Sequence, residues 1–205
     1  MDLLNRLAGG RKRRTLPIFP LGTVLLPGSL LPLRIFEVRY MDMARACLRD
    51  SSPFGVCLIR EGQEVGAPAV PEAVGCEARI ADCDMEELGI LKVRARGFGR
   101  FRIVASEVSR QGLIVGEVEE IESEAPQPDA PGLAESAEFL RKAIAGIGEE
   151  RFVQPFAFDD ASWVGFRLAE ILPLRMDVKQ KLLELTDAGM RLAVLHKFLR
   201  QQELI

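Results

Sequence analysis

The sequence predicts an α+β protein in which a small, mostly antiparallel β-barrel with one helix is followed by an α-helical bundle. Three observations predict it. Residues 15–121 carry short apolar runs punctuated by glycine and proline, residues after 132 repeat apolar side chains at helical spacing, and an acidic segment with three prolines lies between them. We therefore expect a barrel domain at 15–122, an extended linker at 123–131 that belongs to neither core, and a bundle domain at 132–203.

Alternating and continuous apolar residues locate the strands of the barrel. They predict strands at 54–59, 74–80, 91–95, 101–105 and 113–121. The sequence Gly97-Phe98-Gly99 separates the third of these strands from the fourth, so we expect a hairpin that turns at the glycines. Apolar residues at spacings of three and four predict one helix at 37–48.

Four amphipathic segments predict the helices of the bundle. They are expected at 133–147, 160–172, 177–185 and 187–199. Asp160, Asp177 and Asp187 are placed to cap the last three helices, because a short carboxylate accepts hydrogen bonds from the free N–H groups of a first turn. Gly148 predicts the C-cap of the first helix.

The composition argues against several kinds of site. His196 is the single histidine, which excludes a metal site with two imidazoles from one chain and disfavours a histidine-dependent hydrolase. Its place beside Leu195, on the apolar side of the last helix, favours a packing role. The four cysteines form no C-x-x-C pair, so we expect reduced core residues and neither a metal nor a cofactor. They are Cys47, Cys57, Cys76 and Cys83.

The N-terminal region predicts no targeting signal. Its basic run Arg11-Lys12-Arg13-Arg14 is followed by an apolar stretch that four prolines interrupt, which disfavours a signal peptide. No uninterrupted apolar run reaches the roughly 18 residues of a membrane helix. We therefore expect a cytoplasmic protein without a membrane partner.

Motifs for phosphate binding and nucleophilic catalysis are missing from the sequence. It contains no G-x-x-x-x-G-K-[ST] loop and no G-x-S-x-G turn. Spacing alone leaves open a Ser–Lys dyad or a cysteine paired with His196, and neither has a supporting motif. We expect a binding protein with no catalytic residue.

An arginine-rich segment offers a candidate anionic-ligand face. Arg96-Gly97-Phe98-Gly99 matches the opening of an RNA-recognition signature, but Arg100 stands where that signature needs an aromatic residue. If the predicted hairpin keeps its register, five cations share one face: Lys92, Arg94, Arg96, Arg100 and Arg102. This face is either a solvated strand surface or a patch for nucleic acid and other anions, and the net charge of −3 favours the first.

Five blocks of the sequence resemble, in the same order, the N-terminal domain of the bacterial ATP-dependent Lon protease. They are LPIFPLGTVLLPGSLLPLRIFEVRY at 16–40, FGVCLI at 54–59, VGCEARI at 74–80, LKVRARGFGRFRI at 91–103 and FRLAEILPLRMDVKQKLLEL at 166–185. The resemblance implies a six-stranded barrel of the PUA (pseudouridine-synthase-and-archaeosine-transglycosylase) type followed by a helical part. It also implies a domain that recognises and holds unfolded polypeptides and assists assembly.

In full-length Lon proteins, an ATPase module and a Ser–Lys protease module follow this domain. The sequence ends at Ile205 without room for either, so we expect a stand-alone substrate-binding-domain protein and no peptidase activity. The implied partners are unfolded or partly folded polypeptides and a separate ATP-dependent protease or chaperone. The sequence gives no indication of oligomeric state.

A polypeptide-binding role needs an apolar surface or an open strand edge, and the apolar stretch 25–36 suggests where to look. The candidate binding residues are Leu26, Leu33, Arg34, Phe36, Glu37 and Tyr40. One interpretation places part of this stretch in a groove between barrel and bundle. The other has Leu26, Leu31, Leu33 and Phe36 fill the barrel.

Two local features of this stretch are also predicted. Pro27-Gly28 indicates a turn. Arg34, Glu37 and Arg39 are candidates for an ion-pair cluster at the start of the first helix, where an acidic residue is favourable.

Overall fold

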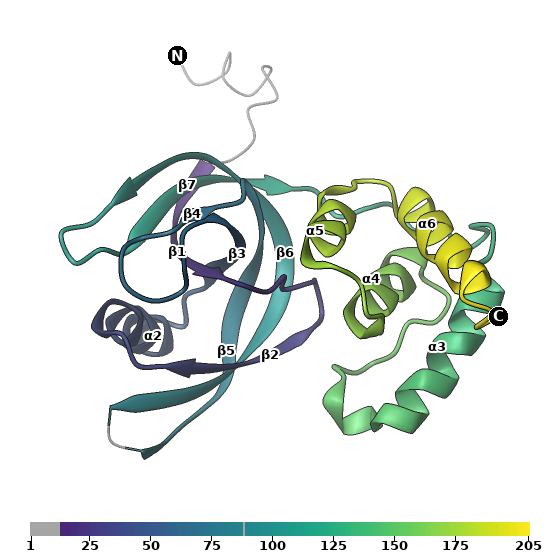
Figure 1. Cartoon of the computed structure of the whole chain (residues 1–205), viewed down its shortest axis with the longest axis horizontal. Coiled ribbons are helices and arrows are strands. Elements are labelled where there is room, and N and C mark those ends of the chain that lie inside the picture. Colours follow the sequence, from purple (N-terminus) through teal and green to yellow (C-terminus); the bar gives the residue numbers. More distant parts are fainter. Residues whose placement is uncertain (1–12, 88) are drawn as a thin grey trace.

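The computed structural model describes residues 13–87 and 89–205, so Arg11 and Lys12 of the basic run lie outside the described residues. Its first half is a barrel with one helix (Figure 1). The strands are β1 (Arg13–Leu21), β2 (Leu30–Ile35), β3 (Phe54–Glu61), β4 (Val70–Pro71), β5 (Val74–Glu87), β6 (Ile90–Val108) and β7 (Ile114–Ile121), and the helix is α2 (Val38–Asp50).

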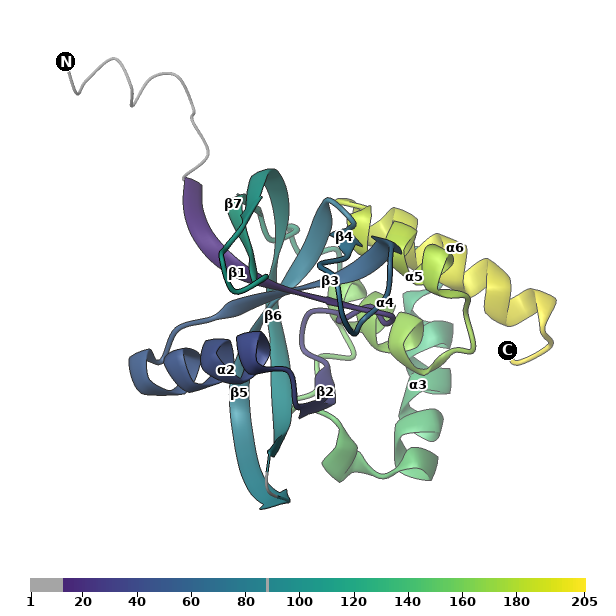
Figure 2. The ribbon, with the colours of Figure 1, turned by 60° about the vertical axis from the view of Figure 1, so that its left-hand side comes forward.

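The second half is helical and packs against one side of the barrel (Figures 1 and 2). Its elements are α3 (Leu133–Ile147), the 3₁₀ turn η1 (Glu149–Arg151), α4 (Ala161–Ile171), α5 (Met176–Glu184) and α6 (Ala188–Gln201). The predicted α+β class is confirmed. No helix within the described ranges has the length and apolarity needed to cross a membrane.

Five strands close the barrel. Antiparallel ladders run from β1 through β7, β6 and β5 to β3, and a parallel pairing of β3 with β1 completes the circuit. Strand β2 stands outside this circuit, because within the described residues it pairs with β6 alone, from Leu30 opposite Arg96 to Ile35 opposite Leu91. The short β4 extends the edge of β3.

Three apolar clusters form the interior of the described residues: two lie in the barrel half, and the third, the helical core, lies among the helices. Helix α2 turns its apolar stripe into the barrel, where the rings of Phe19 and Tyr40 stack with centroids 4.0 Å apart. The helical core contains two residues of the barrel half, Leu26 and Val74. The barrel and the helices therefore share one set of buried apolar contacts, and these contacts hold the two halves against each other.

The predicted hairpin at Gly97-Phe98-Gly99 is wrong. Strand β6 runs without a turn through all three residues. The main chain of the β1–β2 connection approaches Gly97, whose N–H donates to Ser29 O at 2.9 Å while its carbonyl accepts from Gly28 N–H at 3.0 Å. A Cβ at Gly97 would lie 2.4 Å from Leu26 O, so glycine serves a close backbone approach here rather than a turn.

The caps and turns are mostly confirmed. Asp160 accepts from Ser162 N–H and Asp187 from Met190 N–H, as expected of N-caps, and Gly148 is the C-cap of α3 at φ 110°. Asp177 is not a cap. It lies in the first turn of α5 behind the N-cap Arg175, whose guanidinium it pairs with at 2.8 Å.

The linker does contribute to a core, which corrects a second expectation. The side chain of Glu124 is 3% exposed and is held by Arg100 of β6 and Arg191 of α6. A buried carboxylate requires such partners, and acidic composition alone does not reveal them. A third correction concerns the cysteines: Cys47, Cys57 and Cys76 are buried, but Cys83 is exposed on β5.

A candidate polypeptide-binding site at the barrel seam

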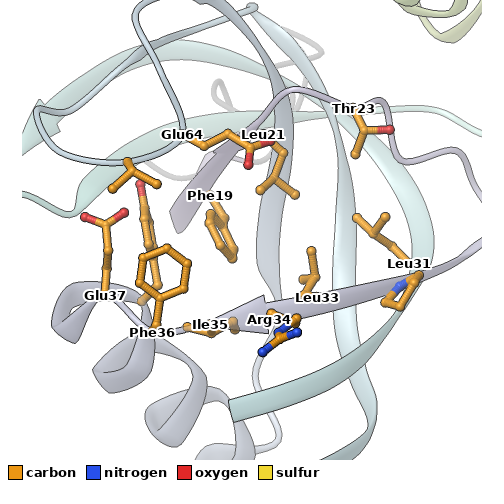
Figure 3. A pocket seen from close by; sticks show the side chains of 13 residues that line it. Phe19, Leu21, Thr23, Leu31, Leu33, Arg34, Ile35, Phe36, Glu37 and Glu64 are labelled. Atoms are coloured by element: carbon orange, nitrogen blue, oxygen red, sulfur yellow. The ribbon is translucent and has the colours of Figure 1, made fainter. Parts of the chain in front are cut away.

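A pocket of about 360 Å³ opens between β2 and the end of β1, and we call it the seam pocket. Its walls come from β2, the end of β1, the start of α2 and the loop 62–69 (Figure 3). The lining residues are Phe19, Leu21, Thr23, Leu31, Pro32, Leu33, Arg34, Ile35, Phe36, Glu37, Tyr40, Glu64 and Val65.

The turn before β2 sets the position of this strand. Pro27 and Gly28 occupy its centre, Ser29 N–H donates to Leu26 O at 3.0 Å, and Gly28 has φ 77°, a combination typical of a type II turn. The predicted turn is thus confirmed. Arg167 of α4 fixes it from the helical side, donating to Pro27 O at 2.6 Å and to Ser29 Oγ at 2.9 Å.

The floor of the pocket is apolar and continues to the surface. Phe19 and Leu21 point from β1 toward Leu33 on β2 (Figure 3). Phe36 and Val65 stand at the rim with exposed fractions of 53% and 55%. Together with the apolar floor, these two side chains form a continuous apolar surface, the kind of feature that marks a candidate interaction site.

The acidic groups around the pocket are already engaged. Glu37 Oε2 lies 2.9 Å from Arg39 Nη2, and Arg39 also donates to Gly112 O at 3.0 Å and covers the Tyr40 ring at 4.7 Å. Glu64 accepts from Gly22 N–H at 2.5 Å, which ties the loop 62–69 to the end of β1. Burial raises the pKa of the Tyr40 phenol. The pocket thus presents mainly apolar surface.

The structure brings together five of the six candidate binding residues. Leu33, Arg34, Phe36, Glu37 and Tyr40 line the seam pocket. Leu26 does not line it, because its side chain is buried in the helical core.

The first interpretation of the stretch 25–36 holds for Leu30 and Pro32, which line a second cleft between the barrel and the helices. The seam pocket, which holds five of the six candidate binding residues, lies within the barrel half. Leu31 and Leu33 are only partly buried and Phe36 is exposed, so they do not fill the barrel. Of the predicted ion-pair cluster, the Glu37–Arg39 pair is present.

Eight of the thirteen lining residues were not among the candidates, and Phe19, Leu21 and Val65 lie outside the stretch that suggested the site. Phe19 and Leu21 alternate with Ile18 and Pro20, so strand periodicity could have assigned them to one face. Val65 sits in a loop that carries no periodic signal. Its contribution depends on how the loop 62–69 folds back toward β1.

The five cations of the arginine-rich segment do not form one exposed face. Arg100 is buried beneath the helices, where it donates to Leu183 O at 2.9 Å and to Glu124 at 2.8 Å. Arg94 pairs with Asp82 at 3.2 Å, and Arg96 lies over the Phe98 ring at 5.1 Å. Lys92 and Arg102 stand opposite Asp84 and Glu119 in their ladders. One of the five cations is buried and three others have acidic neighbours, so they do not form the continuous basic face that suggested an anion-binding patch.

Apart from the exposed Cys83, the histidine and the cysteines occupy packed positions. His196 Nδ1 lies 3.2 Å from Ser136 Oγ, but Ser136 is fully buried between α3 and α6, so this hydroxyl cannot meet a substrate. Burial raises the pKa of Cys76 to about 12 and raises that of Cys57 further. These groups are placed for packing, as expected of His196.

The described residues thus form a barrel with a partly open apolar pocket, packed against a helical half. Residues 15–201 match the substrate-binding domain of the ATP-dependent protease La (LON), and the chain belongs to this family. No curated protein matches the sequence.

Solved structures agree with this assignment. The Lon N-terminal domain protein from Xanthomonas campestris is 41% identical, with a TM-score of 0.75 over 89% of this chain and 96% of that one. The N-terminal domain of the Mycobacterium avium complex Lon protease is 23% identical, with a TM-score of 0.66 and the same coverage, and shares the fold. The matched family is a substrate-binding domain and not a catalytic one.

Proposed function

We propose that this protein binds exposed apolar segments of unfolded or partly folded polypeptides at the seam pocket. The observation that carries the proposal is the apolar surface that continues from Leu33 in the floor to Phe36 and Val65 at the rim. Folded proteins bury most of their large apolar side chains, whereas unfolded chains expose them. A surface of this kind therefore favours unfolded polypeptides over folded ones.

The expected affinity is modest. Removing the exposed half of a phenyl ring from water contributes about 1 kcal/mol, and a few such contacts must also offset the ordering of a flexible chain. We therefore expect dissociation constants in the micromolar range, on the order of 1–100 μM. Weak, reversible binding allows the polypeptide to dissociate and to be transferred to another protein.

We also propose that the protein acts by binding alone and presents its ligand to a separate ATP-dependent protease or chaperone. Membership of the Lon substrate-binding family supports this role, because recognition in that family serves a protease. A cytoplasmic location fits the role and keeps the cysteines reduced, and all four are free thiols in the structure.

A titration tests the proposal. The purified protein is titrated against a fluorescently labelled, permanently unfolded polypeptide, and the same polypeptide with its apolar residues replaced by serine is the control. We expect saturable binding of the first and none of the second. Absence of binding at concentrations up to about 100 μM would contradict the proposal.

A further inference from the structure

The outer edge of β2 is available for pairing. Within residues 13–87 and 89–205, β2 pairs on one side with β6, and no strand pairs with its other side. An unpaired edge presents main-chain N–H and C=O groups to any extended chain that comes beside it. Natural proteins cover or interrupt such edges unless a partner uses them.

The hydrogen bond from Gly97 N–H to Ser29 O fixes which groups face outward. Gly97 stands opposite Ser29 in the register of β2 and β6, so this pair is a hydrogen-bonded one. Such pairs alternate with non-bonded pairs along an antiparallel ladder. Leu31 and Leu33 therefore bond toward β6, whereas the main chains of Leu30 and Pro32 point away from it.

Pro32 fits this geometry. Its ring nitrogen carries no hydrogen, and proline occurs in strands where the missing N–H would face away from the neighbouring strand. The residue removes one donor from the open edge and leaves the carbonyls of Leu30 and Pro32 as acceptors. It also weakens edge-to-edge pairing between two copies of the protein, because each copy would place a proline in the new ladder.

Pockets lie on both sides of this edge. Leu31 and Leu33 line the seam pocket, Leu30 lines a cleft of about 520 Å³ between the barrel and the helices, and Pro32 borders both. On its helical side, this interdomain cleft is lined by the apolar residues Ile147, Phe152 and Ile171 and by the charged residues Glu150, Arg151 and Glu170. Ile147 is 40% exposed.

We propose that the captured polypeptide adds to the sheet as a strand along the outer edge of β2. Successive side chains of a strand point to opposite faces of its sheet, so alternate side chains of the ligand enter the seam pocket and the interdomain cleft. The ligand is an extended segment whose residues toward the seam pocket are apolar, while its alternate residues meet both apolar and charged side chains in the interdomain cleft. Main-chain pairing supplies affinity that is independent of sequence, as suits varied unfolded chains. This inference rests on the proposed function and specifies its binding mode.

Two N-methylated peptides provide the test. A labelled ten-residue peptide that binds in the titration above is remade with N-methyl groups on its odd residues, and separately on its even residues. A strand that pairs on one edge directs only one of these two sets of amides to β2. We expect one methylated peptide to bind at least about tenfold more weakly and the other to stay within about twofold of the parent.

Two further measurements show where on the protein the peptide binds. Hydrogen exchange of the Leu30 amide should slow when the parent peptide binds, and Ile147→Asp should weaken binding although Ile147 lies outside the seam pocket. Val178→Asp on α5 is the matched control, since Val178 is similarly exposed at 37%. Equal effects of the two methylation patterns would overturn strand addition while leaving the proposed function in place. Failure of every unmodified peptide to bind would overturn both.

Discussion

Glu124 Oε2 accepts a hydrogen bond from Arg191 Nη1 at 2.8 Å, joining the segment between the two halves to the last helix. The same carboxylate accepts from Arg100 Nη2 of β6 at 2.8 Å and from Ser162 Oγ of α4 at 2.7 Å. One acidic side chain thus connects the barrel, α4 and α6. These contacts and the shared apolar core join the barrel to the helices.

Glu124→Gln should strongly destabilise the protein. The substitution keeps the shape of the side chain but leaves the buried guanidinium groups of Arg100 and Arg191 without their countercharge. Removing one partner of a buried ion pair costs about 3–5 kcal/mol. Urea unfolding should show a loss of that size. Glu122→Gln, at an exposed neighbouring position, should change stability little, and equal losses for the two variants would contradict the role of Glu124.

The stability that Glu124 contributes should depend on pH. Burial raises the pKa of this carboxyl, but hydrogen bonds from Arg191 and Ser162 and the guanidinium charges outweigh burial and lower it overall. Its contribution is therefore present above the unfolded-state pKa of about 4.3 and is lost as pH falls through the lower folded-state value. The stability difference between the protein and Glu124→Gln should shrink from about pH 7 to about pH 3. A constant difference would contradict this assignment.

Gly97→Ala should destabilise the protein much more than Gly99→Ala. A Cβ at Gly97 meets Leu26 O, whereas one at Gly99 has no atom within 4 Å. Forcing the β1–β2 connection away from β6 costs about 1–3 kcal/mol by analogy with overpacked cores. Thermal unfolding of the two variants measures the difference. If the glycines served a hairpin, Gly99→Ala would be at least as harmful.

Gly97 and Gly99 also show which part of the fold could not be predicted from the sequence. Alternation on both sides of Gly97 correctly located strand segments, and end signals at Asp160, Asp187 and Gly148 correctly located helix ends. A glycine that admits another chain segment looks the same in sequence as one that turns. Only the position of the β1–β2 connection distinguishes the two cases.

The candidate site was predictable to a similar degree. The stretch 25–36 pointed to Leu33 and Phe36 because it is apolar and rich in proline, and polypeptide binding needs an apolar surface. Leu26 was misassigned because a helical core far along the chain covers it. The buried state of Arg100 has the same cause, since periodicity reports the face of a strand but not what packs on that face.

Cys83 should be the single reactive cysteine of the folded protein. Burial raises the pKa of Cys47, Cys57 and Cys76, which keeps these thiols protonated, and their sulfur atoms are shielded from reagent. Cys83 is exposed. Mass spectrometry after brief treatment with iodoacetamide should find one adduct, on Cys83, and four after denaturation. Rapid labelling of Cys76 in the folded state would show that the barrel opens.

Phe36→Ala should weaken polypeptide binding without loss of stability. The ring is half exposed, so its removal costs the fold little, but it forms the rim of the seam pocket. Loss of an aromatic contact at a binding surface corresponds to about fivefold to tenfold in affinity. Val108→Ala is the matched control, because Val108 is 56% exposed and does not line the pocket. Equal effects of the two variants would exclude a specific role for Phe36.

The most direct measurement is an amide NMR titration of the protein with the unfolded polypeptide. If the seam pocket is the binding site, shift changes should centre on 30–37 and on the loop 62–69, and should saturate with the dissociation constant from fluorescence. Saturable changes centred on α5 and α6, with 30–37 and 62–69 unaffected, would contradict the proposed site.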